Sequence, residues 1–492
     1  MKVFSSILVV TVLVGHSLVA LAQGGGGRGG GHIRSARELP LPGVVQTQAE
    51  LSVVLGCPTD TSVTLNVLSA SDASAAVEYG ETATALTHKL ASLALTASTP
   101  WEMQIKGLKP DKQYFYRLSI AKRGETGVFD VREGTIHTQR ALGQAFTFAL
   151  QGDSHPERPQ QFDSSLYLQT LAAVSLDRPD FYLLLGDDFS VDTLRTVNSS
   201  EVQRVYLFQR AFLGQLAQSV PLFLVNGNHE QASAANLDGT PDNVAVWAQT
   251  ARNSLFALPD TGGIYTGDAE PVPHIGLLRD YYAWTWGDAL FVVIDPYWHS
   301  SKAVDNPYGG GEKPRNLWES MLGDSQYKWL AKTLESSNAK YKFVFNHHIL
   351  GTGRGGIEEV PLFEWGGRDK NGQDLFASKR PGWAMPLHQL FVKNGVSVVF
   401  QGHDHIFAHQ ELDGVTYQTL AEPADPNYAS YNFEAYQRGD KRPNSGYVRV
   451  KVAADSATVE YVRQYLPKDE NATQHSGDVA FSYSVAPRGS KP

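Results

Sequence analysis

At residues 222–230 the chain reads Leu-Phe-Leu-Val-Asn-Gly-Asn-His-Glu, so an apolar run leads directly into a cluster of polar side chains. Four more junctions of this kind occur, and each pairs a short apolar run with a polar motif: 146–150 with Asp153-Ser-His155, 181–185 with Gly186-Asp187, 343–345 with His347-His348, and 396–400 with Gly402-His403-Asp404-His405. Short runs rich in β-branched and aromatic residues predict buried strands. Ligands of open α/β sheets gather beyond the carboxyl ends of the strands, so we expect the five motifs to converge.

The residue types in these motifs are those of an open catalytic metal site. Two cations about 3.5 to 4 Å apart need a bridging anion, which the carboxylate of Asp187 can supply. Asp153, His155 and His405 would complete the first position, and Asn228, His347 and His403 the second. Imidazoles and carboxylates suit Fe, Mn and Zn. Structural zinc sites usually use cysteine, which the motifs lack.

Each motif alone could arise by chance, but the ordered set resembles the calcineurin-like metallophosphoesterase superfamily. The signature of that family is Asp-x-His, Gly-Asp, Gly-Asn-His, a lone His and Gly-x-His, and the match spans residues 145–463. The resemblance implies a two-layered α/β sandwich with a binuclear site that hydrolyses phosphate esters. It also implies the division of ligands given above. His229 is implied to protonate the leaving group or to steady the phosphate.

Several neighbours of these motifs are further candidates. Adjacent residues of a strand point to opposite faces, so only one of His347 and His348 should reach a metal. The family pattern favours His347, which leaves His348 behind the ligands or facing the substrate. Arg354 is a candidate for binding phosphate bidentately. Glu230 and Asp404 are the nearest carboxylates that could tune the pKa of His229, unless they are merely solvated in their loops.

The segment before these motifs predicts a separate all-β domain. Alternating residues at 63–67, 76–79, 101–108 and 113–121, with a turn at Lys109-Pro-Asp111, are typical of a β-sandwich. The segment resembles the fibronectin type III-like domain that precedes the catalytic domain of purple acid phosphatases. We therefore predict a sandwich over 40–141 and a metallophosphoesterase domain over 142–492, closed by a hairpin at 447–463.

The chain departs from the purple acid phosphatases at one informative position. Those enzymes carry a tyrosine ligand to ferric iron three residues after the bridging aspartate, where this chain has Ser190. It also carries His155, where they usually have no histidine. Exchanging a phenolate for an imidazole removes a negative charge, so a divalent pair such as Mn, Zn or Fe(II) becomes more favourable. The sequence predicts a colourless enzyme.

The leading hypothesis is a phosphomonoesterase that acts on a small-molecule phosphate ester. A binuclear site can lower the pKa of bound water towards about 7, which makes hydroxide available for in-line attack on phosphorus. A phosphodiesterase or nuclease could use the same site with another pocket shape. A non-catalytic binding protein, with the sandwich engaging a partner, is a third alternative, against which the completeness of the ligand set argues.

Composition and the N-terminal residues bear on partners and location. The net charge of the 492 residues is −9, which gives no basic footprint for a stable nucleic-acid partner.

The N-terminal residues predict a signal peptide over 1–22, followed by a glycine-rich linker over 23–39. The evidence for the signal peptide is Lys2, an apolar stretch at 3–14 and the small residues of Ala20-Leu-Ala22. We therefore expect a secreted or periplasmic protein without a transmembrane segment in the mature chain; an uncleaved membrane anchor is the alternative. Cys57 is the single cysteine, so no intramolecular disulfide can form. The sequence makes no prediction of oligomeric state.

Overall fold

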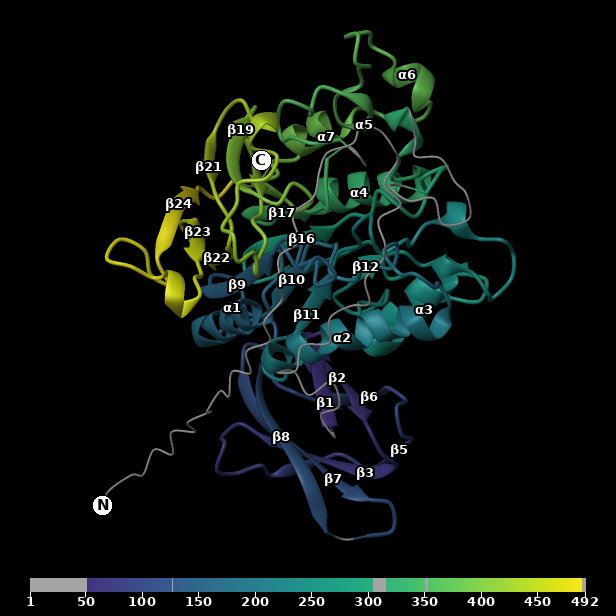
Figure 1. Cartoon of the computed structure of the whole chain (residues 1–492), viewed down its shortest axis with the longest axis vertical. Helices are drawn as coiled ribbons and strands as arrows, with labels where there is room; N and C mark the ends of the chain where they lie inside the picture. The colour runs from purple at the N-terminus through teal and green to yellow at the C-terminus, as the bar shows by residue number, and fades with distance from the viewer. Residues whose placement is uncertain (1–50, 126, 304–315, 350–352, 489–492) are drawn as a thin grey trace, which may run out of the picture. The chain divides into compact units, whose positions relative to one another are not determined.

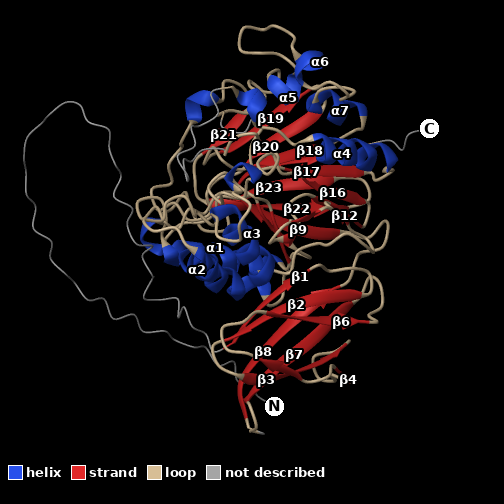
Figure 2. Ribbon diagram, turned by 90° about the vertical axis from the view of Figure 1, so that its right-hand side faces the viewer, coloured by secondary structure: helices blue, strands red, loops and turns tan. Residues whose placement is uncertain are grey.

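The described residues form an all-β region followed by a larger α/β region (Figures 1 and 2). The computed structural model describes residues 51–488, apart from 126, 304–315 and 350–352. The predicted signal peptide and glycine-rich linker lie outside these residues, as do residues 40–50 of the predicted sandwich. Within the described residues, no helix is both long and apolar enough to cross a membrane.

The all-β region consists of two facing sheets. Its strands are β1 (Leu51–Gly56), β2 (Ser62–Ser69), β3 (Ala73–Gly80), β4 (His88–Lys89), β5 (Leu93–Leu95), β6 (Trp101–Lys106), β7 (Gln113–Lys122) and β8 (Val128–His137). One sheet has the order β1-β2-β6, and the other has the order β4-β3-β7-β8 with β5 beside β3. Along β7, Tyr114, Tyr116, Leu118 and Ile120 are buried at every second position in the core between the sheets. The predicted alternation is confirmed, whereas the likeness to fibronectin type III domains stays a prediction.

The first sheet of the α/β region carries three of the five predicted strands. Its strands are β9 (Phe146–Gln151), β10 (Tyr182–Leu184), β11 (Leu222–Leu224), β22 (Gly446–Val452), β23 (Ala457–Arg463) and β24 (Val479–Val485). Their order is β11-β10-β9-β22-β23-β24. Strands β9, β10 and β11 are parallel, so the motifs that follow them emerge at one edge. The antiparallel pair β22 and β23 forms a hairpin at the expected residues, and β24 follows it and pairs with β23 at the edge of the sheet.

The second sheet carries the other two predicted strands. Its strands are β12 (Thr266–Gly267), β15 (Tyr282–Trp286), β16 (Ala289–Val293), β17 (Tyr341–Phe345), β18 (Val398–Gln401), β19 (Phe407–Leu412), β20 (Val415–Thr419) and β21 (Asp440–Arg442). Their order is β12-β15-β16-β17-β18-β20-β19-β21, with β16, β17, β18 and β20 parallel. A separate small hairpin pairs β13 (Pro271–Val272) with β14 (Gly276–Leu277).

Helices cover the outer faces of the two sheets, and aromatic side chains fill the space between them. The helices are α1 (Ser164–Asp177), α2 (Ser199–Ala217), α3 (Val244–Leu255), α4 (Asp324–Ser336), α5 (Phe363–Gly366), α6 (Phe376–Lys379) and α7 (Leu387–Lys393). Asp163, Asn198 and Asn243 cap α1, α2 and α3 by accepting hydrogen bonds from first-turn N–H groups. Phe148 and Phe291 lie edge to face, 5.1 Å apart, in the layer between the sheets. The predicted two-layered α/β sandwich is confirmed.

A buried arginine links α2 to the all-β region. The guanidinium of Arg210 donates to the side chain and carbonyl oxygens of both Ser52 and Asn66, and to the carbonyl oxygen of Leu255. Burial lowers the pKa of Arg210 to about 9. A second link joins the Tyr116 hydroxyl to the carbonyl of Gln218, at 2.6 Å. Polar groups of the all-β region therefore satisfy a charge that the α/β region buries.

Candidate metal centre

The first group of candidate ligands is formed by Asp153, His155 and His405, which follow β9 and β18. One ligand atom from each of these buried side chains lies within 4.8 Å of the others. The backbone N–H of His403 donates to Asp153 Oδ1 at 2.7 Å. Asp153 Oδ2 lies 3.2 Å from His405 Nε2 and 3.7 Å from His155 Nε2. One carboxylate oxygen is thus fixed by the backbone while the other faces both imidazoles.

Buried carboxylates orient the two imidazoles of this first group. His155 Nδ1 lies 2.8 Å from Glu157 Oε1, and His405 Nδ1 lies 2.9 Å from Glu422 Oε1. Although burial opposes the charge, Glu422 and Asp153 raise the pKa of His405 to about 9. Burial likewise opposes ionisation of Glu157, but the neighbouring His155 lowers its pKa to about 2. Because Nδ1 of each ring is engaged, Nε2 is the atom available for a metal.

The second group contains His347, His348 and His403. One nitrogen of each buried ring lies within 4.8 Å of the others. His347 Nδ1 donates to the carbonyl oxygen of Leu185 at 2.7 Å. Its Nε2 lies 3.1 Å from Asn228 Oδ1, so the predicted amide ligand is in place beside it. In this group the oxygen that fixes the tautomer is a neutral carbonyl.

The position of His348 differs from the sequence expectation. Alternation of side chains holds only within a strand, and β17 ends at Phe345, two residues before His347. The ring of His348 stacks on His403 with centroids 3.9 Å apart, and its Nδ1 is bonded to the hydroxyl of Tyr297. His347 and His348 therefore present nitrogens to the same place rather than to opposite faces.

Asp187 lies between the two groups. Its Oδ2 is 3.1 Å from His347 Nε2 and 3.6 Å from His155 Nε2, while its Oδ1 accepts the backbone N–H of His229 at 2.9 Å. Although burial opposes ionisation, His347 and His229 hold the pKa of Asp187 far below its usual range. The geometry is that of a carboxylate within reach of two ligand groups at once.

Strained backbone accompanies these side chains. Four candidate ligands have a left-handed backbone: His155 (φ 41°), Asp187 (φ 58°), His403 (φ 68°) and His405 (φ 54°). Such a conformation costs on the order of 1 kcal/mol or more for a residue with a Cβ, and it clusters at functional sites. A Cβ at Gly402 would meet Asp153 Oδ1 at 2.4 Å, which explains the glycine of that motif. The sharp turns aim the ligands inward.

The donor set fits metal cations. His155 Nε2, His348 Nε2 and His403 Nε2 are buried and form no hydrogen bond with any described residue. Leaving a buried polar atom unsatisfied costs about 1–3 kcal/mol, and a cation would satisfy several of them together. Although burial opposes the charge, Asp187 and Asp153 raise the pKa of His347 to about 10, so the metal-free site favours protons where a cation could sit. Nitrogen and oxygen ligands of this kind suit Fe, Mn or Zn.

His229 lies beside the ligands and is held by residues that sequence reasoning missed. Its Nδ1 is 2.7 Å from Asp192 Oδ2, and its Nε2 is 3.1 Å from a guanidinium nitrogen of Arg158. Although burial opposes the charge, Asp192 and Asp187 raise the pKa of His229 to about 10. Asp192 follows Asp187 by five residues, but no sequence pattern indicates that its loop folds back onto His229.

Glu230 and Asp404 have other partners than the expected His229. Glu230 accepts four backbone N–H groups, those of Gly227, Asp187, Asp188 and Phe189. Asp404 Oδ2 accepts from the backbone of Gly355 and from the hydroxyl of Tyr436, both at 2.7 Å. These two carboxylates brace the ligand-bearing loops, and an influence of either on the pKa of His229 stays a prediction.

Arg354 lies at the edge of the second group. A guanidinium nitrogen donates to the carbonyl oxygen of His403, and it lies 3.2 Å from Asp404 Oδ1. The side chain is 42% exposed. It is therefore positioned beside the candidate ligands, with part of its surface open to a ligand from solvent.

The residues that form the candidate metal centre lie within a segment that matches a known protein family. Residues 146–407 match the calcineurin-like phosphoesterases, and this match covers more than half of the 492 residues. The chain belongs to the calcineurin-like phosphoesterase family. The expectation of a phosphoesterase is confirmed at the level of the family.

Three comparisons place this phosphoesterase among known proteins. It is 24% identical over 246 residues to serine/threonine-protein phosphatase CPPED1 from Pongo abelii, an alignment that covers 49% of the chain and 57% of that protein. The structure of PhoD is similar with a TM-score of 0.62 and 16% identity, covering 89% of this chain and 90% of PhoD. The purple acid phosphatase PPD1 from yellow lupin (Lupinus luteus) has a TM-score of 0.57 and 15% identity, covering 89% and 74%. The two solved structures establish the fold.

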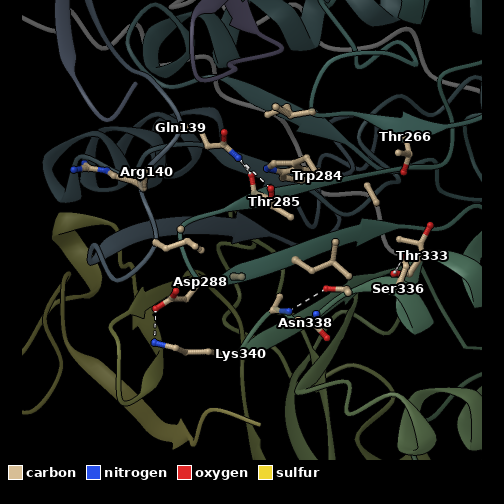
Figure 3. A pocket seen from close by; sticks show the side chains of 18 of the residues that line it. Gln139, Arg140, Thr266, Trp284, Thr285, Asp288, Thr333, Ser336, Asn338 and Lys340 are labelled. Carbon is tan, nitrogen blue, oxygen red and sulfur yellow. Dashed lines mark hydrogen bonds and ion pairs between the residues drawn. The ribbon is translucent and has the colours of Figure 1, made fainter. Parts of the chain in front are cut away.

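A cavity of about 860 Å³ lies at the other ends of the strands of this phosphoesterase (Figure 3). It is lined by the turn between β15 and β16, the last turn of α4 and the segment 139–142. Gln139 donates to the carbonyl of Thr285 at 2.7 Å, and Lys340 pairs with Asp288 at 2.8 Å. Because β16 and β17 begin here, the cavity is separate from the candidate metal centre at their carboxyl ends.

Proposed function

We propose that this phosphoesterase is an exported phosphomonoesterase with two cations in its active site. The observation that carries the proposal is the pair of ligand groups that share Asp187, whose Oδ2 lies 3.1 Å from His347 Nε2 and 3.6 Å from His155 Nε2. A carboxylate in this position can bridge two cations, as hydrolysis of phosphate esters by two-metal sites requires.

The ligand assignment follows the two groups. Asp153, His155, Asp187 and His405 would hold the first cation, and Asp187, Asn228, His347 and His403 the second, as Fe, Mn or Zn. Such cations supply an activated water and neutralise the phosphoryl oxygens. His348, fixed by Tyr297, faces the same space and is assigned to the substrate side. With Ser190 in place of a phenolate, we expect the loaded protein to be colourless.

His229 is suited to protonate the leaving group. Asp192 holds the ring through Nδ1 at 2.7 Å, which leaves Nε2 as the atom that can donate to substrate. The side chain is 18% exposed, so a ligand from solvent can reach it. Arg354, at the far side of the second group, can supply hydrogen bonds to a phosphoryl oxygen.

The proposal extends to organisation and location. We assign 1–22 as signal peptide, 23–39 as linker, 40–141 as a fibronectin type III-like sandwich and 142–492 as the catalytic domain, with secretion or export to the periplasm. The basis is the N-terminal sequence pattern together with the strands β1 to β8, which end at His137. A small-molecule phosphate ester is the proposed substrate.

The test combines metal content with turnover. Purified protein is analysed for metals, and hydrolysis of 4-nitrophenyl phosphate and bis(4-nitrophenyl) phosphate is measured before chelation, after chelation and after re-addition of each metal. We expect two equivalents of metal, chelator-sensitive turnover and a preference for the monoester. A preference for the diester would identify a phosphodiesterase using the same site. Failure of reconstituted protein to hydrolyse either ester would contradict the proposal.

A further inference from the structure

The positively charged side chain of Arg158 lies beside His229 and is oriented by contacts within its own loop. Arg158 begins a turn in which its N–H donates to the carbonyl of His155 at 3.0 Å and its carbonyl accepts the N–H of Gln161 at 2.8 Å. Arg158 Nε lies 3.3 Å from Glu157 Oε1, and another guanidinium nitrogen lies 3.4 Å from Gln161 Oε1. The loop therefore orients the guanidinium before any ligand arrives.

The guanidinium meets the one nitrogen of His229 that could face a substrate. Arg158 approaches Nε2 at 3.1 Å, whereas Nδ1 is engaged by Asp192 on the other side of the ring. The side chain of Arg158 is 26% exposed and that of His229 is 18% exposed, so solvent or a ligand can reach the place where they meet. The ring of His229 also lies edge to face with that of His155, at 5.0 Å between centroids. The meeting place thus borders the first ligand group.

We propose that Arg158 is a further catalytic residue, which binds the same substrate oxygen as His229. This inference rests on the proposed function, in which His229 Nε2 faces the leaving group. The guanidinium lies 3.1 Å from that nitrogen, so an anionic oxygen bound by one of the two groups is within reach of the other. A guanidinium is always charged and forms strong hydrogen bonds to phosphate oxygens.

The step balances with the groups present. Water adds its oxygen to phosphorus as the bond between phosphorus and the ester oxygen breaks, and the proton on His229 Nε2 moves to that ester oxygen, which leaves as an alcohol. The proton released from the water restores the acid form of His229. Arg158 donates a hydrogen bond and keeps its proton, so it stabilises the negative charge that develops on the oxygen.

A purely structural role of Arg158 has a distinct signature. Glu157 contacts both Arg158 and the candidate ligand His155, so loss of the arginine could act by loosening the metal. In that case metal content would fall together with activity. The test therefore measures metal content, turnover and binding of inorganic phosphate on the same samples.

The variants are Arg158→Gln, Arg158→Lys and, as a matched control, Arg204→Gln, which removes a guanidinium paired with Glu201 on α2. With metals loaded, we expect Arg158→Gln to keep its metal content and to lose about 10²-fold in kcat/KM, the effect typical of removing one donor to a developing charge. Calorimetry should show inorganic phosphate binding about tenfold or more weakly. Arg158→Lys should recover part of both losses, and the control should match the wild type.

A double variant tests whether the two residues share one oxygen. If they do, adding Arg158→Gln to His229→Ala should cost far less than it does alone. Unchanged kcat/KM and phosphate affinity in Arg158→Gln, loss of metal in proportion to activity, or fully additive losses would each overturn the inference. If the wild type hydrolyses no ester but binds phosphate in an Arg158-dependent way, the proposed reaction fails while the anion contact stands. A wild type that binds no phosphate would overturn both.

Discussion

The two ligand groups of the candidate centre differ in what holds their imidazoles. In the first group, His155 and His405 are backed by the carboxylates of Glu157 and Glu422. In the second, His347 is backed by a carbonyl oxygen and His348 by the hydroxyl of Tyr297. A carboxylate behind an imidazole raises its basicity as a ligand. The first position is therefore richer in negative charge and should bind its cation more tightly.

The extra negative charge around the first group is relevant to Ser190, which stands where purple acid phosphatases have a tyrosine ligand. Ser190 Oγ lies 3.4 Å from His155 Nδ1, so the residue at the tyrosine position stands behind a histidine ligand instead of ligating. Glu157, two residues after His155, places a carboxylate at the same nitrogen. The carboxylate of Glu157 thus supplies a negative charge in place of the phenolate. It lies behind the ligand His155 and does not bind the metal itself, so it gives no phenolate-to-iron colour.

The largest effect should come from the residue that both groups share. Asp187→Asn removes the charge facing His347 and His155. We expect metal content to fall below one equivalent and turnover to drop by roughly 10⁴-fold, because a two-metal site without its bridge cannot hold the pair. Elemental analysis and ester hydrolysis check this. Retention of two equivalents would show that the groups do not depend on Asp187.

His229→Ala should separate turnover from metal binding, because the proposed ligand sets are complete without this ring, although one of its atoms also lies within 4.8 Å of ligand atoms of His155 and Asp187. We expect two equivalents of metal and a loss of about 10²–10⁴-fold in kcat, as for a general acid. The loss should grow with the pKa of the leaving-group alcohol, measured over a series of alkyl and aryl phosphates. Full activity on esters with poor leaving groups would remove His229 from the role of acid.

Glu157→Gln should make the first group resemble the second. Loss of a carboxylate behind a ligand typically costs 10–100-fold in metal affinity, so we expect a loss in that range at the first position. Tyr297→Phe, which removes the neutral partner of His348 and leaves the proposed ligands of the second cation in place, should cost less. Competition with a fluorescent chelator measures both affinities. Equal losses in the two variants would contradict the charge asymmetry.

The smallest effect is a pH dependence of stability in metal-free protein. His405 and His347 have folded pKa values raised to about 9 and about 10, so their contribution is complete below about pH 6.5 and is lost as the pH rises through those values. Asp187 has a depressed pKa, so its contribution is present above about pH 4 and is lost on acidification.

Thermal unfolding at pH 5 to 9, with and without chelator, measures this dependence. The melting temperature of chelated protein should fall above pH 6.5, whereas metal-loaded protein should hold it, since cations replace the protons. The difference in melting temperature between metal-loaded and chelated protein should therefore increase with pH. A gap that narrows over this range would show that protons and metals do not compete for these side chains.

The sequence predicted the strands and the motifs because both signals are local. Apolar runs such as 146–150 and 222–225 coincide closely with β9 and β11, and the order of the motifs carried the family resemblance. Asp192, Arg158 and Glu422 were missed because they lie in loops without periodicity and reach the centre only through tertiary folding. The strand rule could not separate His347 from His348, because β17 ends before His347, and the substrate-side role of His348 stays a prediction.

Arg210 makes the all-β region inseparable from the enzyme. Four of its hydrogen-bond acceptors belong to Ser52 and Asn66 in β1 and β2. Removing those strands would take away these four acceptors and would uncover the part of the α/β core that packs on Val54. A chimaera in which another β-sandwich replaces this region should fold only if that sandwich offers Arg210 the same hydrogen-bond acceptors. We therefore expect the all-β region and the α/β region to unfold together.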